Sequence, residues 1–394
     1  MQGHKLLHNF LQKSSSIHAK RITAVTNASG ALLIGKRLTL TGLARSSLRK
    51  TKQRHAIRGM DRLLGNKKLQ QEQGEIYKTL MGYLLTGEKA WILIDWSPIN
   101  NRKNSFLLRA SAPLKGRSYT LYQEVHSKQN SPVIEKLFLK KLAKLLPKKI
   151  KPIIVADAGF RATWFKEVIA LGFDFVGRVR NKNKYRNTNS EKWNYTSSLY
   201  DKANNKAQGV PSVLLAKSNQ IKCNFVLIKK DIKGRKRKNS TGTLSRNTQS
   251  KRSAKAAREP WLLATSLSIT NIKEMNKIVF FYEKRMQIEE EFRDTKSPRY
   301  GHGLRYSLTN DAKRIEILLL IATLTCFASW LIALSAQRKK LHYDYQSNSI
   351  KNRTVLSITY LASLVTRKKV YFTKKELLTS LAEVRELVNL EGCL

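Results

Sequence analysis

The segment 282–296, YEKRMQIEEEFRDTK, carries four side chains whose types and spacing suit chemistry on phosphate groups. At about 100° per residue of an α-helix, these four side chains fall within roughly 60° of one another. They are Tyr282, Arg285, Glu289 and Lys296. Glu290 and Glu291 lie about 80° and 180° round, so Glu289 is the only glutamate on that face. One carboxylate among phosphate-binding groups suggests metal-assisted phosphoryl transfer, and an exposed helix with ordinary charge pairs is the alternative.

An apolar stripe beside this face indicates how the segment is held. Phe281, Ile288 and Phe292 fall next to the polar face on the same helical wheel. The pattern therefore predicts one continuous helix over 282–296, seated on a core.

Two aspartates end runs that are typical of buried strands. Asp95 lies near the end of AWILIDW over 90–96, and Asp157 ends PIIVAD over 152–157. For either aspartate alone, a structural cap is the favoured interpretation. The surrounding elements are expected in the order β-β-β-α-β-α-β, which allows the first and fourth strands to be neighbours in an open sheet. We therefore expect Asp95 and Asp157 to meet, with a following helix bringing Glu289 to them.

Composition points to a polyanionic partner. The 394 residues include 75 Lys and Arg against 27 Asp and Glu, a formal net charge of +48. A positive charge spread through the chain favours nucleic acid as the partner. The three cysteines lack metal-ligand or disulfide spacing, and no signal peptide is visible, so a cytoplasmic protein is expected.

The N-terminal region carries a two-faced helix. Residues 41–48 and 54–64 indicate two short helices, with Gly65 ending the second. In the second, an apolar row is matched by a basic row that contains Arg58 and Arg62. This pattern resembles a helix-turn-helix DNA-binding unit, although helical hairpins of this length are common.

Two later segments change the character of the chain. Residues 229–258 are strongly basic, and within them the stretch 234–253 has too few apolar residues to fold alone, which indicates a basic flexible loop within an insertion. Residues 317–336 contain no charge and are long enough to span a membrane. Because basic residues flank this segment on both sides and it has no counterpart, we prefer a buried core helix and expect no membrane association.

The polar face and both aspartate segments resemble one family. The pattern Y-x2-R-x3-E-x6-K, with LIDWS, ADAGF and EPWLLAT, is similar to the DDE transposases of the bacterial insertion-sequence-four family. The similarity covers nearly the whole chain. It implies a ribonuclease H-like α/β core with a β-rich insertion, flanked by a helical N-terminal DNA-binding region and a helical C-terminal region.

The same resemblance implies roles for individual residues. Asp95, Asp157 and Glu289 would bind two Mg²⁺ ions, with Mn²⁺ as a substitute, because hard cations prefer oxygen ligands. Water would nick the transposon end, and the freed 3′-hydroxyl would form a hairpin that is later reopened and joined to target DNA. The remaining expected DNA contacts are Tyr282, Arg285, Lys296, Trp261, Met286, Arg178 and Arg180. Among these, Trp261 would stack on a flipped base and Met286 would probe the gap.

The expected partners and domains follow from this family. The partners are double-stranded DNA, as terminal inverted repeats and target, and a second copy of the chain in a synaptic homodimer. The expected parts are 1–88, helical and DNA-binding; 89–180 and 261–345, the two halves of the core; 181–260, the insertion; and 346–394, helical.

Three other functions stay open at this point. A metal-dependent nuclease of the same fold would cut without joining strands. A non-catalytic DNA-binding or ribosome-associated protein would use the carboxylates structurally. A membrane protein would be built on residues 317–336.

Overall fold

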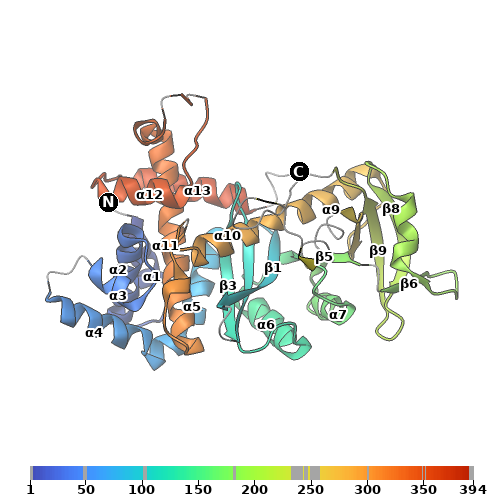
Figure 1. Ribbon diagram of the computed structural model, residues 1–394, viewed down its shortest axis with the longest axis horizontal. Helices are drawn as coiled ribbons and strands as arrows, with labels where there is room; N and C mark the ends of the chain where they lie inside the picture. The colour runs from blue at the N-terminus through green and yellow to red at the C-terminus, as the bar shows by residue number, and fades with distance from the viewer. Residues whose placement is uncertain are drawn as a thin grey trace. The chain divides into compact units, whose positions relative to one another are not determined.

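The computed structural model describes residues 3–47, 51–100, 104–180, 183–231, 243, 247, 248, 258–299, 301–347, 349, 350 and 352–389. Most of the basic loop expected over 234–253 lies outside these residues. The chain forms two compact units, one made of Met1–Pro152 with Met286–Leu394 and the other of Ile153–Arg285. We call them unit 1 and unit 2, and Figure 1 shows their elements.

The sheet of unit 1 is an antiparallel meander, as predicted. Strands β1 (Lys89–Asn100), β2 (Ser105–Pro113) and β3 (Ser118–His126) pair in sequence order. In this register Asp95 of β1 lies opposite Arg109 of β2. Helix α6 (Pro132–Leu145) follows and buries Phe138, Leu139 and Leu142.

Helix α11 (Ala312–Arg338) is the core helix of unit 1. Of its most apolar stretch, 89% is buried, and it contacts β3 and helices α1 (Gly3–Ser14), α2 (Ala19–Gly35) and α5 (Lys67–Leu84). Although this helix is long and apolar enough to cross a membrane, its burial on all sides accounts for its composition. The preference for a core helix is confirmed.

Shorter helices complete unit 1. In the N-terminal region α3 (Leu40–Arg45) precedes α4 (Gln53–Leu64), which Gly65 caps. The C-terminal helices are α12 (Ile358–Arg367) and α13 (Lys374–Val388), and Thr373 with Glu376 forms the capping box expected of α13. The 3₁₀ turns are η2 (Leu304–Tyr306) and η3 (Leu341–Tyr345).

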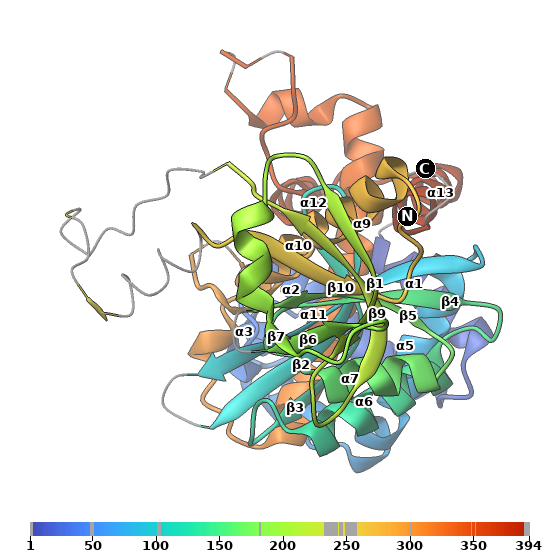
Figure 2. The same ribbon diagram turned by 90° about the vertical axis from the view of Figure 1, so that its right-hand side faces the viewer.

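Unit 2 is rich in β-structure. Strands β4 (Lys151–Ala156) and β5 (Asp174–Val179) are parallel and are joined by α7 (Ala162–Ala170). The sheet continues from β5 through β10 (Trp261–Thr265), β9 (Ile221–Ile228), β8 (Gln208–Leu215) and β6 (Lys184–Asn187) to β7 (Asn194–Tyr195). Figure 2 labels β5, β6, β7, β9 and β10. The remaining elements are η1 (Thr196–Lys202) and α9 (Ile272–Lys284).

The order of elements is that of the predicted ribonuclease H-like core. A three-stranded meander precedes a β-α-β unit with parallel strands, and the β-rich insertion follows β5. The N-terminal and C-terminal regions are helical, also as predicted.

The prediction of one continuous helix over 282–296 is wrong. Helix α9 ends at Lys284 and α10 (Met286–Lys296) begins two residues later. Arg285 keeps helical backbone angles, but its amide donates to the carbonyl of Tyr282, three residues back, at 3.1 Å. Such a tightened turn interrupts the regular ladder without a glycine or proline to announce it. The boundary between units 1 and 2 falls at this point.

Candidate active site

Asp95 lies in a buried strand of unit 1. Its side chain is only 8% exposed, and its Oδ1 accepts a hydrogen bond of 2.8 Å from the backbone amide of Trp96. The strand forms because its apolar neighbours on both sides are buried in the core of the unit. The fold therefore places a carboxylate where water has little access.

Helix α10 carries the next two predicted residues. Glu289 is exposed, whereas Lys296 is buried and donates from Nζ to Ser97 Oγ at 2.5 Å and to the Pro98 carbonyl at 3.1 Å. Burial lowers the pKa of Lys296 to about 8, and nearby Arg305 and Arg109 add to this effect, while attraction to Asp95 opposes it. Lys296 thus joins α10 to β1 close to Asp95.

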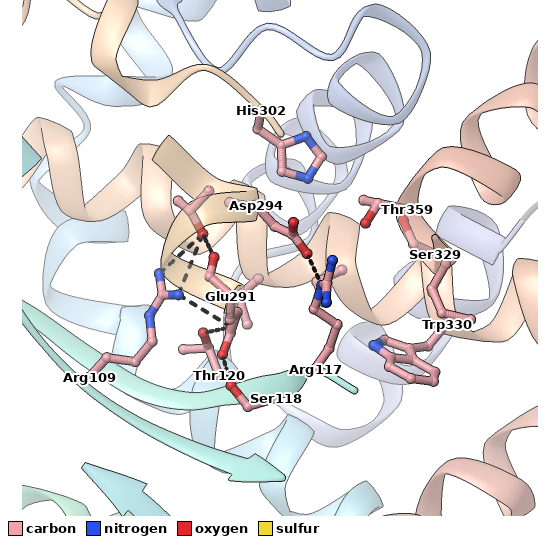
Figure 3. A pocket seen from close by; sticks show the side chains of 15 residues that line it. Arg109, Arg117, Ser118, Thr120, Glu291, Asp294, His302, Ser329, Trp330 and Thr359 are labelled. Atoms are coloured by element: carbon pink, nitrogen blue, oxygen red, sulfur yellow. Dashed lines mark hydrogen bonds and ion pairs between the residues drawn. The ribbon is translucent and has the colours of Figure 1, made fainter. Parts of the chain in front are cut away.

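A buried carboxylate on the opposite side of α10 fixes the helix to the sheet (Figure 3). Glu291 accepts hydrogen bonds from Ser118 at 2.5 Å, from Ser111 at 2.8 Å and from Thr120. Arg109 faces the same carboxylate at 3.4 Å. Because every one of these groups is buried, the network fixes both the rotation of α10 about its axis and its position on the sheet.

Two further contacts hold α10 at its ends. Near its start, Gln287 accepts a 2.9 Å hydrogen bond from the amide of Leu114. Near its end, Asp294 accepts a 2.7 Å hydrogen bond from Arg117 Nε (Figure 3). Arg117 and Asp294 line a pocket together with His302. Burial lowers the pKa of His302 to about 4, so its ring is neutral at pH 7.

Sequence reasoning missed Arg109 and Glu291. The helical wheel correctly placed Glu291 opposite Glu289. It gave no reason to expect that the side of α10 with Glu291 packs on the sheet. One signal was present: Arg109 interrupts the otherwise apolar strand FLLRASA over 106–112. A charge in such a run needs a buried partner, and Glu291 is that partner.

In unit 2, Asp157 lies directly after β4 in a tight turn. Its side chain is half-buried, and its Oδ1 accepts a 2.7 Å hydrogen bond from the amide of Gly159. A Cβ atom at Gly159 would lie 2.9 Å from the same oxygen, closer than side-chain carbons approach. Glycine is therefore needed at 159 for the carboxylate to keep this position.

Three other predicted residues of unit 2 lie around Tyr282. It is 5% exposed, and its ring meets Trp261 edge to face with 5.0 Å between the ring centroids. Arg285 lies over the ring at 5.8 Å, and Arg178 shares a hydrogen bond with the hydroxyl. Burial raises the pKa of Tyr282; the two arginines oppose this shift and Asp157 adds to it. The two arginines and Asp157 therefore share one electrostatic environment.

The remaining predicted residues lie at varied positions. Arg180 forms an ion pair with Glu259 at 2.7 Å. Met286, at the start of α10, is 44% exposed, which is unusual for methionine. Arg58 and Arg62 lie on the exposed side of α4, as their row predicted. Trp261 is partly exposed.

The oxygen ligands present are those that hard divalent cations prefer. Asp95 and Glu289 belong to unit 1 and Asp157 to unit 2. Within the described ranges, no three His, Cys, Asp or Glu side chains are grouped closely enough to hold a metal ion. The chemistry of the donors fits Mg²⁺ or Mn²⁺.

A ribonuclease H-like core with one aspartate within its first strand, another directly after its fourth strand and a glutamate on a later helix is typical of enzymes that cleave the phosphodiester bonds of nucleic acids. The family described as "Transposase DDE domain" matches residues 89–326, more than half of the chain. The protein therefore belongs to the DDE transposase family.

Two further comparisons complete this result. No curated protein matches the chain. Among solved structures, a cryo-EM structure of the piggyBac transposase synaptic complex with hairpin DNA matches with 12% identity and a TM-score of 0.43. The match covers 93% of this chain and 76% of that one.

Proposed function

We propose that this DDE transposase is a cut-and-paste enzyme of the insertion-sequence-four family, most similar to the transposase of transposon ten. The observation that carries the proposal is the match of the DDE domain to residues 89–326, together with Tyr282, Arg285, Glu289 and Lys296 at the family spacing. The enzyme would act as a synaptic homodimer on double-stranded DNA in the bacterial cytoplasm.

Asp95, Asp157 and Glu289 are the proposed ligands of two Mg²⁺ ions, with Mn²⁺ as the substitute. When bound, such ions supply Lewis-acid activation of the attacking oxygen and charge stabilisation at the leaving oxygen. The limited water access to Asp95 favours this role, because electrostatic interactions strengthen as water is excluded. The hydrogen bond from the amide of Gly159 restricts the Asp157 carboxylate to one orientation.

The cationic and aromatic groups around Tyr282 are proposed to bind the DNA end. Arg285 and Arg178 present guanidinium groups that can hold phosphate oxygens with two hydrogen bonds. The partly exposed Trp261 ring is the proposed platform for the flipped base of the hairpin, and the exposed Met286 is the proposed probe of the gap. Lys296 would act near Asp95, where it offsets negative charge.

The decisive experiment is cleavage of a supercoiled plasmid that carries the element's own ends, with Mg²⁺ present. The native protein should release the element with hairpin ends and join it to a target plasmid. Glu289→Gln should reduce cleavage by at least about 1,000-fold while end binding stays intact, because a neutral amide oxygen binds Mg²⁺ much more weakly than a carboxylate does.

Glu290→Gln is the matched control, since Glu290 is the next residue of α10 and its half-buried side chain pairs with Arg117 at 3.6 Å. This variant should cleave like the native protein. If Glu289→Gln also cleaved normally, the carboxylate would be structural and the chain a DNA-binding protein. Cleavage without joining to the target would instead identify a nuclease of the same fold.

A further inference from the structure

The hairpin of β6 and β7 in unit 2 carries two aromatic rings, each paired with a cation. Lys184 Nζ lies 5.1 Å from the ring centroid of Tyr195, and Arg186 lies 5.7 Å from that of Trp193. Lys184 and Tyr195 are directly opposite in the register of the two strands. We call these four residues the hairpin face.

The other side of the same hairpin is anchored in the unit. Tyr185, between the two cations in sequence, is 8% exposed and meets Phe225 edge to face at 5.7 Å. Because side chains alternate along a strand, Lys184 and Arg186 point the opposite way. The hairpin face therefore looks outward, and Tyr195 is 55% exposed.

The hairpin face is fixed in position and lies at the edge of its sheet. Strand β7 is the last strand of the sheet. Arg186 Nη1 donates to the carbonyl of Ser190 at 2.7 Å, which holds the guanidinium beside Trp193. A pre-positioned ring loses little conformational entropy when a flat ligand stacks on it.

We propose that the hairpin face binds single-stranded DNA. In an extended chain, rings two residues apart lie roughly 7 Å apart, so Trp193 and Tyr195 can each take one of two successive bases. Lys184 and Arg186 would neutralise the phosphates beside those bases. The proposal rests on the proposed function, since the proposed hairpin step leaves at least one base unpaired at the transposon end.

A base-paired duplex fits this face less well. The bases of a duplex are stacked on one another, and only the two cations would then meet the DNA backbone. Stacking on side chains needs bases that are unpaired and splayed out. Preference for single strands is therefore the property that distinguishes this site from general attraction to a chain of charge +48.

The test is binding of the full chain to a 20-nucleotide single strand and to the duplex of the same sequence, by fluorescence anisotropy. The double variant Trp193→Ala with Tyr195→Ala should bind the single strand about 10-fold to 100-fold more weakly. Its duplex binding should change less than about threefold. Tyr371→Ala, which removes a ring of similar exposure at 57%, is the matched control and should change neither affinity.

A second variant keeps the rings. Trp193→Phe with Tyr195→Phe should retain single-strand binding within about threefold, because stacking needs only a flat ring. Equal losses on single strand and duplex, or no loss on either, would overturn the proposal. Plasmid cleavage by the same preparations distinguishes this inference from the proposed function. Normal cleavage by a native protein that shows no preference for single strands would overturn only this inference. A preference for single strands without cleavage would overturn only the proposed function.

Discussion

Neighbouring glutamates of α10 have different environments. Glu289 is exposed, and Glu291 is buried among three hydroxyl groups and Arg109. The helical wheel alone separated them correctly, because direction round a helix depends only on spacing. Burial could not be predicted in the same way, since it depends on strands β2 and β3, far away in sequence.

Removing the buried carboxylate should cost much more stability than removing a surface one. Glu291→Ala leaves Arg109, which is 1% exposed, without its opposite charge, and should lower the free energy of unfolding by about 3 to 5 kcal/mol. Urea denaturation of the purified protein measures this. The surface variant Glu290→Ala should cost less than about 1 kcal/mol. Similar losses for the two variants would show that the Glu291 network does not hold α10.

At the scale of elements, the strands were the most predictable parts. The runs around Asp95 and Asp157 contain apolar residues that are buried on both sides, which a short continuous pattern predicts. The break at Arg285 was not predictable, because the residues on either side favour a helix and neither a glycine nor a proline marks the tightened turn. The role of Gly159 is likewise visible only once the Asp157 side chain is placed.

A substitution in the turn after β4 tests the position of Asp157 without changing an apolar core residue. Gly159→Ala brings a methyl group within 2.9 Å of Asp157 Oδ1 and should displace that carboxylate. We expect plasmid cleavage to fall by at least about 10-fold, since small displacements of catalytic groups are costly. Gly82→Ala, where the added methyl meets nothing within 4 Å, is the control for thermal stability and activity. Unchanged cleavage by Gly159→Ala would mean that Asp157 needs no such support.

For the whole molecule, composition alone predicts the net charge. Which of the charged side chains lie on the surface can be known only from the structure. Arg58 and Arg62 are exposed on α4, as their spacing indicated, while Arg109 is buried against Glu291. Composition therefore predicts the class of partner but overstates the number of contacting cations. The division into two units at Arg285 also had no signal in the sequence.

Binding of the transposon end should depend steeply on salt. We expect the affinity to fall by about 10³-fold or more between 50 and 200 mM salt, because cations displace counterions from phosphates. Arg58→Ala and Arg62→Ala should each reduce the slope of log affinity against log salt by about 1. Lys140→Ala, an exposed cation on α6, is the control and should leave the slope unchanged. Slopes unaffected by the α4 variants would remove this helix from the DNA interface.

The packing of α11 has a consequence for synthesis of the protein. Thr325 of α11 bonds to Ser29 of α2, 296 residues earlier in the chain. At about 5 to 20 residues per second, a ribosome needs roughly 15 to 60 seconds to make that stretch. During this interval the apolar sides of α1 and α2 lack the helix that covers them, whereas unit 2 is contiguous in sequence and is finished before α11 is made. A nascent chain that stops before residue 312 therefore exposes apolar surface of its first helices that the finished protein buries.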